Sequence, residues 1–147
     1  MIHIRPADDQ DELAVQELLG QLGYVFTAEE VRARLVLLAT SGTDPVLLAT
    51  EDSRAVGLIA MHCATMLHYR DPVARITALV VRDDVRGKGV GRILVDAGAN
   101  LAGQAGCGLM ELTTAVHRTE SQAFYEALGF TTSSLRFHRV LKGEVVS

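Results

Sequence analysis

Residues 79–95 read LVVRDDVRGKGVGRILV, an order of residue types that predicts a strand, a turn and a helix. The β-branched apolar run at 79–81 is typical of a buried strand, and the apolar residues after the glycines recur with helical spacing. Gly87, Gly89 and Gly91 stand at alternate positions, so the turn can expose successive backbone N–H groups. The helix adds unpaired N–H groups and the positive end of its dipole. The stretch therefore predicts an anion site, best filled by a phosphate or pyrophosphate.

The local charge of the stretch also favours an anionic ligand. The stretch carries four basic and two acidic residues, a balance of plus two, whereas the whole chain has a formal charge of −4. Two better-known glycine motifs do not fit. A P-loop needs Lys and then Ser or Thr after its last glycine, but Arg92 and Ile93 follow Gly91. A dinucleotide fingerprint needs a glycine five residues after Gly87, where Arg92 stands.

Composition indicates an ordinary soluble globular protein. The chain has 147 residues, of which 48% are apolar and 22% charged, so we expect a single domain, 1–147. No apolar run is long enough to span a membrane, and the first residues do not resemble a secretory signal, so we expect a cytoplasmic protein. The acidic balance argues against nucleic acid as a partner. Cys63 and Cys107 lack the spacing of metal ligands, so we expect buried thiols and no metal.

The remaining residues alternate between strand and helix patterns. Helices are expected from about Asp9 to Leu22, from Thr27 to Leu38, from Gly89 to Gln104 and from Glu120 to Leu128. Strands are expected at 2–5, 45–50, 55–64, 74–81, 109–114, 130–132 and 135–141. The succession of strand, helix and strand after residue 74 implies a parallel pairing. The pattern thus predicts an α/β protein with a mixed sheet of about seven strands and about four helices on its two faces.

Two motifs carry a resemblance to a known family. Arg86-x-x-Gly89-x-Gly91, preceded by Leu-Val-Val, is one, and the segment AFYEALGF at 123–130 is the other. With these motifs the chain resembles the GNAT superfamily of N-acetyltransferases over almost its whole length. The resemblance implies the GNAT-like fold, whose mostly antiparallel sheet contains one splayed parallel pair. It also implies acetyl-coenzyme A as co-substrate and an amine of a small molecule or protein as acceptor.

The resemblance further implies which residues contact the cofactor. The backbone of the strand before the turn would pair with the pantetheine arm, and the turn would hold the pyrophosphate. These residues are Leu79, Val80, Val81, Arg86, Gly87, Lys88, Gly89, Val90, Gly91 and Arg92. By the same implication Tyr125 protonates the departing thiolate. Ser121, one helical turn before Tyr125, either reaches the cofactor or only caps its helix.

The group that removes the proton from the amine is less clear from the sequence. Many family members place a carboxylate on the strand before the glycine turn, but residues 76–79 contain none. Glu111 is a candidate because it stands in an apolar strand, although it can equally face solvent or pair with an arginine. His62, His68 and His117 are further candidates. The acceptor can also arrive neutral or lose its proton through water.

Three functions from different classes compete. The leading one is direct acetyl transfer from acetyl-coenzyme A to an amine. A non-catalytic coenzyme A-binding sensor is the alternative, and the missing carboxylate is its main support. The third is a structural dimer module, which leaves the basic glycine turn unexplained. Residues 135–141, rich in aromatics and arginines, predict a strand that either pairs across a homodimer or forms a free sheet edge.

Overall fold

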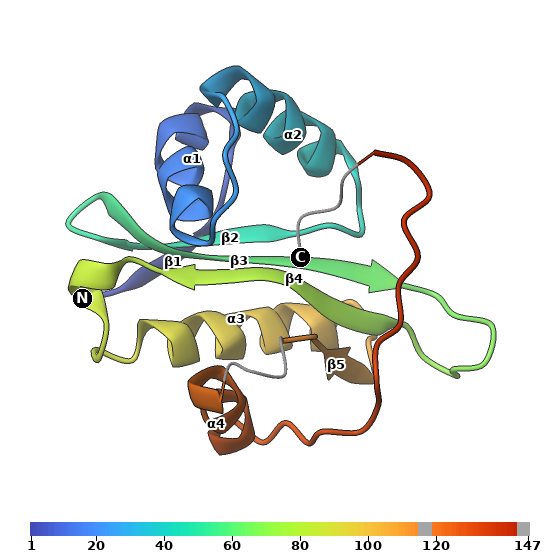
Figure 1. Ribbon diagram of the computed structural model, residues 1–147. Coiled ribbons are helices and arrows are strands. Elements are labelled where there is room, and N and C mark those ends of the chain that lie inside the picture. The colour runs from blue at the N-terminus through green and yellow to red at the C-terminus, as the bar shows by residue number, and fades with distance from the viewer. Residues whose placement is uncertain (115–118, 144–147) are drawn as a thin grey trace. The chain divides into compact units, whose positions relative to one another are not determined.

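The computed structural model describes residues 1–114 and 119–143 of the chain. They fall into two compact units, Met1–Glu111 and Leu112–Ser147. The first unit is layered: one sheet carries helices on both of its faces (Figure 1). This layering follows from strands that alternate buried side chains toward two different helical layers.

The sheet of the first unit has five strands in the order β1-β2-β3-β4-β5. The strands are β1 (His3–Pro6), β2 (Val46–Glu51), β3 (Arg54–Ala64), β4 (Val73–Val81) and β5 (Leu109–Glu111). The first four strands pair antiparallel: residues 7–45 separate β1 from β2 in the chain, whereas β2, β3 and β4 follow one another directly. β5 pairs with β4 in parallel, after the crossover through a helix that a parallel pair requires.

The parallel pair of β4 and β5 is short, and beyond its last ladder pair β4 continues without β5. Its last ladder pair is Arg75 with Glu111, whereas β4 continues to Val81. Among the described residues, 76–81 of β4 therefore pair with β3 only, and their second edge has no strand beside it. We call this stretch the open edge of β4.

Helix starts follow the signals in the sequence. The longer helices are α1 (Glu12–Gln21), α2 (Ala28–Thr40), α3 (Val90–Gln104) and α4 (Thr119–Ala127), with short 3₁₀ turns η1 (Asp9–Asp11) and η2 (Asp83–Val85). The predicted capping box before α2 is confirmed, because Glu30 N–H donates to the Thr27 hydroxyl while Thr27 N–H donates to the Glu30 carboxylate. Asp8 and Asp11 form the same reciprocal cap at η1.

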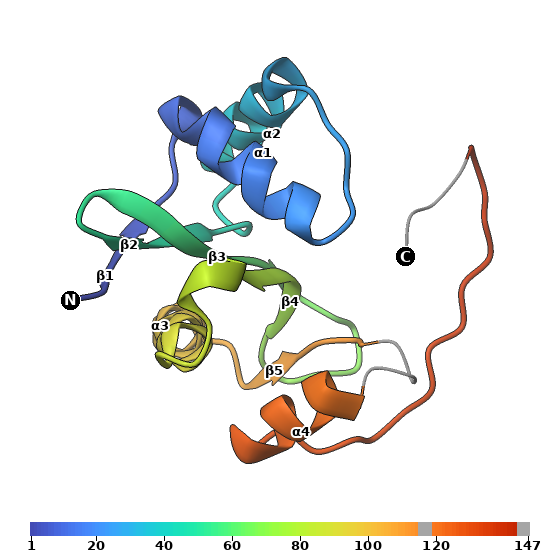
Figure 2. The same cartoon turned by 60° about the vertical axis from the view of Figure 1, so that its left-hand side comes forward.

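Helices α1 and α2 lie on one face of the sheet and α3 lies on the other (Figure 2). On one face α1 and α2 bury Leu18 and Leu35 against Leu58 and Val80, among other side chains. On the other face α3 packs so closely on β3 that a Cβ at Gly57 would lie 2.8 Å from Leu94 Cδ1. The glycine in this strand therefore serves the close approach that its position predicts.

The second unit contains α4 but no strand among its described residues. The prediction of about seven strands was therefore wrong: the sheet has five, and residues 130–132 and 135–141 do not join it. The predicted strand at 109–114 is also shorter, ending at Glu111. Alternation of apolar residues identifies strand-like sequence, but a strand also needs a hydrogen-bonded partner, and residues 131–143 are all exposed.

Candidate functional site

The glycine turn, residues 86–92, forms the end of a helix that no side chain caps. Gly89 is the N-cap of α3, and the first intrahelical bond runs from Ile93 N–H to Gly89 C=O at 3.1 Å. The N–H groups of the three residues between them have no acceptor inside the helix. They point out of the helix end together with the positive pole of the dipole. This geometry suits a phosphate group.

Gly87 and Gly89 are required by backbone conformation. Their φ angles are +84° and +79°, in the left-handed region where other residues are strained. Crowding is not the reason, since a Cβ built on either glycine meets no atom within 4 Å. The space beside the turn is therefore open for a bound group.

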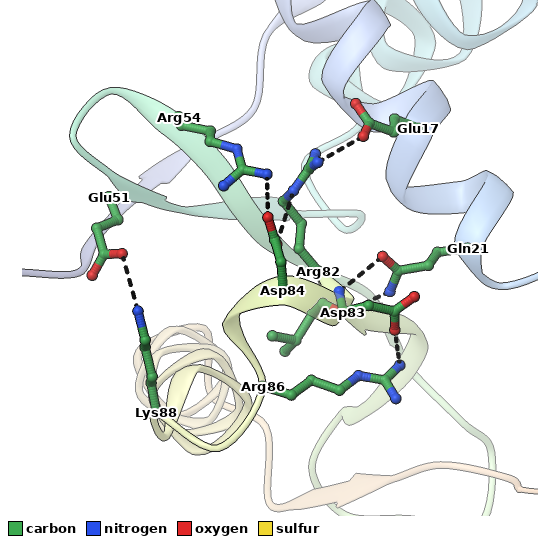
Figure 3. A network of polar contacts seen from close by, with 10 residues as sticks. Glu17, Gln21, Glu51, Arg54, Arg82, Asp83, Asp84, Arg86 and Lys88 are labelled. Atoms are coloured by element: carbon green, nitrogen blue, oxygen red, sulfur yellow. Dashed lines mark hydrogen bonds and ion pairs between the residues drawn. The ribbon is translucent and has the colours of Figure 1, made fainter.

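Ion pairs hold the loop between β4 and the glycine turn against the rest of the first unit (Figure 3). Arg82 contacts Glu17 of α1 at 2.7 Å, and Arg54 of β3 contacts Asp84 at 2.8 Å. The hydrogen bond from Arg82 lowers the pKa of Glu17, and the one from Arg54 lowers the pKa of Asp84. Both carboxylates are thus kept ionised, and the turn is tied to α1 and β3.

Gln21, the last residue of α1, makes a second link to this loop. Its amide Nε2 donates to the carbonyl of Val81 at 2.7 Å, and its Oε1 accepts from the N–H of Asp83 at 3.1 Å. One side chain therefore fixes both the end of β4 and the start of η2 (Figure 3). The sequence analysis missed this residue, because a glutamine at a helix end has no local signal for a partner 60 positions away.

The backbone groups at the open edge of β4 follow from the ladder. Arg82 N–H donates to Val56 C=O of β3 at 2.8 Å. Since successive residues of a strand direct their backbone groups to opposite sides, those of Val81 and Leu79 face away from β3, and those of Val80 face β3. Leu79 thus presents its N–H and C=O at the open edge and Val81 its N–H, since the Val81 carbonyl accepts from Gln21, and an extended ligand with amides can pair with these groups.

The basic residues of the turn differ in their partners. Arg86 pairs with Asp83 at 2.9 Å, and Lys88 lies 4.0 Å from Glu51. Arg92 is exposed and has no ion pair within residues 1–114 and 119–143. A bound anion would therefore meet Arg92 without competition from a carboxylate.

Glu111 lies at the point where the sheet opens. Its carboxylate is 3.6 Å from the guanidinium of Arg75, its ladder partner on β4, and both side chains are about one-third exposed (36% and 37%). This is the arginine pairing that the sequence left open as an alternative. Of the histidine candidates, His62 contacts Asp44, His68 packs on Tyr69, and His117 lies outside the described residues.

Tyr125 and Ser121 belong to the second unit, on α4, and both are half-buried. The end of α4 is a Schellman motif: Phe130 N–H donates to Tyr125 C=O and Gly129 N–H to Glu126 C=O, each at 3.0 Å, with Gly129 at φ +92°. The rings of Tyr125 and Phe130 pack edge to face, with centroids 5.8 Å apart. The glycine and phenylalanine of the second motif therefore fix the backbone and ring of Tyr125, and the predicted C-cap at Gly129 is confirmed.

The described residues lack the features of two other kinds of site. They contain no group of three or more His, Cys, Asp or Glu side chains arranged to hold a metal ion. They also contain no helix with the length and apolarity needed to cross a membrane.

In the described part of the chain, an edge of β4 with no neighbouring strand leads into a helix start that no side chain caps, and these two features suit an extended ligand that carries amides and a phosphate group. The model of the acetyltransferase (GNAT) family matches residues 12–130, so the chain belongs to this family. The predicted class is thereby confirmed: the protein is an N-acetyltransferase of the GNAT type, with acetyl-CoA as co-substrate.

Named relatives agree with this assignment. The chain is 34% identical over 141 residues to the uncharacterized N-acetyltransferase YhdJ of Bacillus subtilis, covering 95% of this chain and 99% of that one. It is also 34% identical over 94 residues to an aminoalkylphosphonate N-acetyltransferase of Salmonella typhimurium, a match covering 64% of this chain and only 61% of that relative.

Solved structures show the same fold. A putative acetyltransferase from Agrobacterium tumefaciens superimposes with a TM-score of 0.87 and 26% identity, over 95% of this chain and 99% of that one. Glucosamine-6-phosphate N-acetyltransferase from Arabidopsis thaliana superimposes with a TM-score of 0.84 and 23% identity, over 97% and 99% of the two chains.

Proposed function

We propose that this chain acetylates a primary amine of a small molecule, using the glycine turn and the open edge of β4 to hold acetyl-CoA. The observation that carries the proposal is the continuity of the two features in one stretch of chain. The peptide groups of Leu79 and Val81 lead through the loop held by Gln21 to the uncapped start of α3. The pantetheine amides would pair along the strand edge, and the diphosphate would accept the N–H groups of the turn.

Tyr125 would act as the acid that protonates the departing thiolate. Support comes from the family motif and from the Schellman motif that fixes this residue. Ser121 would contact the cofactor one helical turn away. Because the family match runs through residues 12–130, we include both compact units in one catalytic domain.

The acceptor is best sought among small amines that carry anionic or hydroxyl groups. The relatives named above act on an aminoalkylphosphonate and on glucosamine-6-phosphate, as their names state. A panel for this chain should therefore contain an aminoalkylphosphonate, a hexosamine phosphate, an aminoglycoside and a lysine peptide. The lysine peptide in this panel tests whether a protein is the acceptor.

The test follows the release of free thiol from acetyl-CoA with each amine, beside calorimetric binding of acetyl-CoA. We expect micromolar binding and amine-dependent thiol release with at least one small amine. Tyr125→Phe should lower kcat by about 100-fold or more, the usual contribution of a positioned acid, without changing the dissociation constant of acetyl-CoA. Tyr69→Phe, which removes the hydroxyl of an exposed tyrosine in the loop between β3 and β4, is the matched control.

Other outcomes separate the competing functions. Binding of acetyl-CoA without thiol release across the panel would favour the coenzyme A-binding sensor. No binding at all would favour a structural module. A Tyr125→Phe protein with unchanged kcat would remove the acid assignment while leaving the transferase itself in place.

We further propose a reducing compartment, such as the cytoplasm, and a homodimer. Cys63 and Cys107 are both free thiols, although they are close enough to share a hydrogen bond. Burial, as the larger cause, and this hydrogen bond, as the next, raise the pKa of Cys63 to about 11. Leu135, Phe137 and Leu141 of the second unit are 79%, 89% and 90% exposed, and a second copy of the chain would cover such apolar side chains. Sedimentation of the protein with and without residues 135–147 tests the dimer.

A further inference from the structure

Four charged or titratable side chains form one row across the sheet of the first unit. Asp44 contacts His62 of β3, His62 is the ladder partner of Arg75, and Arg75 is the ladder partner of Glu111. Directly opposite residues of neighbouring strands share a face, so the four side chains lie on the same side of the sheet. We call Asp44, His62, Arg75 and Glu111 the cross-strand row.

The strand pairing explains how Asp44 reaches His62. The backbone N–H groups of Met61 and Cys63 donate to the carbonyls of Pro45 and Thr43, at 3.0 and 2.7 Å. These two bonds flank Asp44 and His62, which therefore face each other as a closely spaced pair without backbone hydrogen bonds between them. Their side chains meet at 2.6 Å between Asp44 Oδ1 and His62 Nδ1.

The carboxylate of Asp44 is itself held in place. Its second oxygen, Oδ2, accepts from the hydroxyls of Ser41 at 2.5 Å and Thr43 at 3.0 Å. The bond from Ser41 and then the one from His62 lower the pKa of Asp44, against the opposing effect of burial. An ionised carboxylate only accepts hydrogen bonds, so Nδ1 of His62 is the donor. When the imidazole is neutral, Nε2 therefore carries the lone pair.

Nε2 of His62 is available to a ligand. The side chain is 49% exposed, and Nε2 has no hydrogen-bond partner in the part of the chain that the structure describes. The titratable or charged groups facing His62 are Asp44, in the segment just before β2, and Arg75 on β4, with Glu111 beyond Arg75. An imidazole with one nitrogen held by a carboxylate and the other free is the arrangement of a general base.

The row lies beside the open edge of β4. Arg75 and Glu111 are the last pair before β4 and β5 part, and neighbouring strands are about 5 Å apart, so His62 stands about 10 Å from Glu111. Leu58 of β3, in the core under α1 and α2, has the same alternation as His62, so the row is on that face. The turn leads into α3 on the opposite face. Donor and acceptor can thus approach the opening from opposite sides.

We infer that His62, oriented by Asp44, is the general base that takes a proton from the acceptor ammonium group, an inference that rests on the transferase proposed above. Nε2 of His62 accepts one proton from the acceptor ammonium group. The neutral amine nitrogen of the acceptor then attacks the thioester carbonyl carbon. The N–C bond forms, the C–S bond breaks, and the nitrogen loses a second proton. One proton ends on the coenzyme A sulfur and one passes from the imidazolium to water. Asp44 is a positioning residue.

The test compares His62→Gln, Asp44→Asn and Glu111→Gln with wild type in kcat, KM and pH profile, using the best amine of the panel. We expect His62→Gln to lower kcat by about 100-fold and to remove the acidic limb of the kcat/KM profile. Asp44→Asn should lower kcat by about tenfold. His3→Gln, on the outer strand β1, is the matched control and should leave both kcat and the profile unchanged.

Chemical rescue adds a readout that a structural role would not move. We expect free imidazole to restore part of the kcat of His62→Ala but not of Asp44→Asn. A wild-type protein without turnover would refute the transferase, whereas active His62→Gln with an intact acidic limb would overturn this inference alone. An acidic limb lost only in Glu111→Gln would also overturn it and assign the base to Glu111. If His62→Gln does not fold, an Asp44→Asn protein with wild-type kcat and profile overturns it.

Discussion

The glycine turn and the cross-strand row are two sites built by opposite means. The turn is made of consecutive residues, and its chemistry belongs to backbone N–H groups that any sequence with the right glycines exposes. The row is made of side chains from four separate segments, brought together by strand register alone. The difference teaches that the proposed binding of the donor is encoded locally, whereas the proposed chemistry on the acceptor is encoded by strand pairing.

The largest effect on donor binding should come from a β-branched side chain in the glycine turn. Gly89→Val places a β-branched residue at φ +79°, where strain of about 1–2 kcal/mol drives the turn into other conformations. Because only the native turn is competent to bind, we expect the dissociation constant of acetyl-CoA to rise about tenfold or more. Calorimetry measures it.

Gly103→Ala is the control for this substitution, since a Cβ there also meets open space but the helical backbone needs no positive φ. We expect unchanged binding. Equal losses in Gly89→Val and His62→Gln would contradict the division between a binding turn and a catalytic row.

A smaller effect should follow from releasing the loop that joins the two features. Gln21→Ala removes the bonds to Val81 C=O and Asp83 N–H, each worth about 1 kcal/mol at most in an exposed position. We expect weaker acetyl-CoA binding by about threefold, with kcat at saturation unchanged. Gln16→Ala, which removes a bond to the Phe26 carbonyl instead, should leave binding unaffected.

Charge at the turn should matter still less. Arg92→Gln removes an exposed cation, so we expect about a twofold loss of acetyl-CoA affinity at low salt and none at high salt, where such interactions are screened. Binding titrations at two ionic strengths measure the effect. Arg34→Gln, on the exposed side of α2, is the control and should show no dependence of this kind.

The smallest expected effect is a pH dependence of the stability that Asp44 contributes in the cross-strand row. Hydrogen bonds from Ser41 and His62 lower the folded-state pKa of Asp44, so its contribution to stability is present above the unfolded pKa and is lost as pH falls through the folded value. The difference in melting temperature between wild type and Asp44→Asn should therefore shrink below about pH 4. Thermal melts from pH 2 to 7 test this, and a constant difference would contradict it.

The sequence predicts best what neighbouring residues determine. The glycine turn, the capping box at Thr27 and the C-cap at Gly129 each depend on a few adjacent positions, and all three are present. The strands expected at 130–132 and 135–141 fail because alternation says nothing about a partner. His62 was a candidate base, but its link to Asp44, 18 positions away, requires the register of β3 with residues 43–45.

The tight seat of α3 on β3 at Gly57 has a consequence for the choice of donor. Because helix and strand cannot slide past each other there, the start of α3 and the open edge of β4 are a fixed distance apart. In the proposed binding mode, this fixed distance would select thioesters by their length. A short acyl thiol without the nucleotide end would contact the strand edge but not the start of the helix, and would therefore bind through only one of the two features.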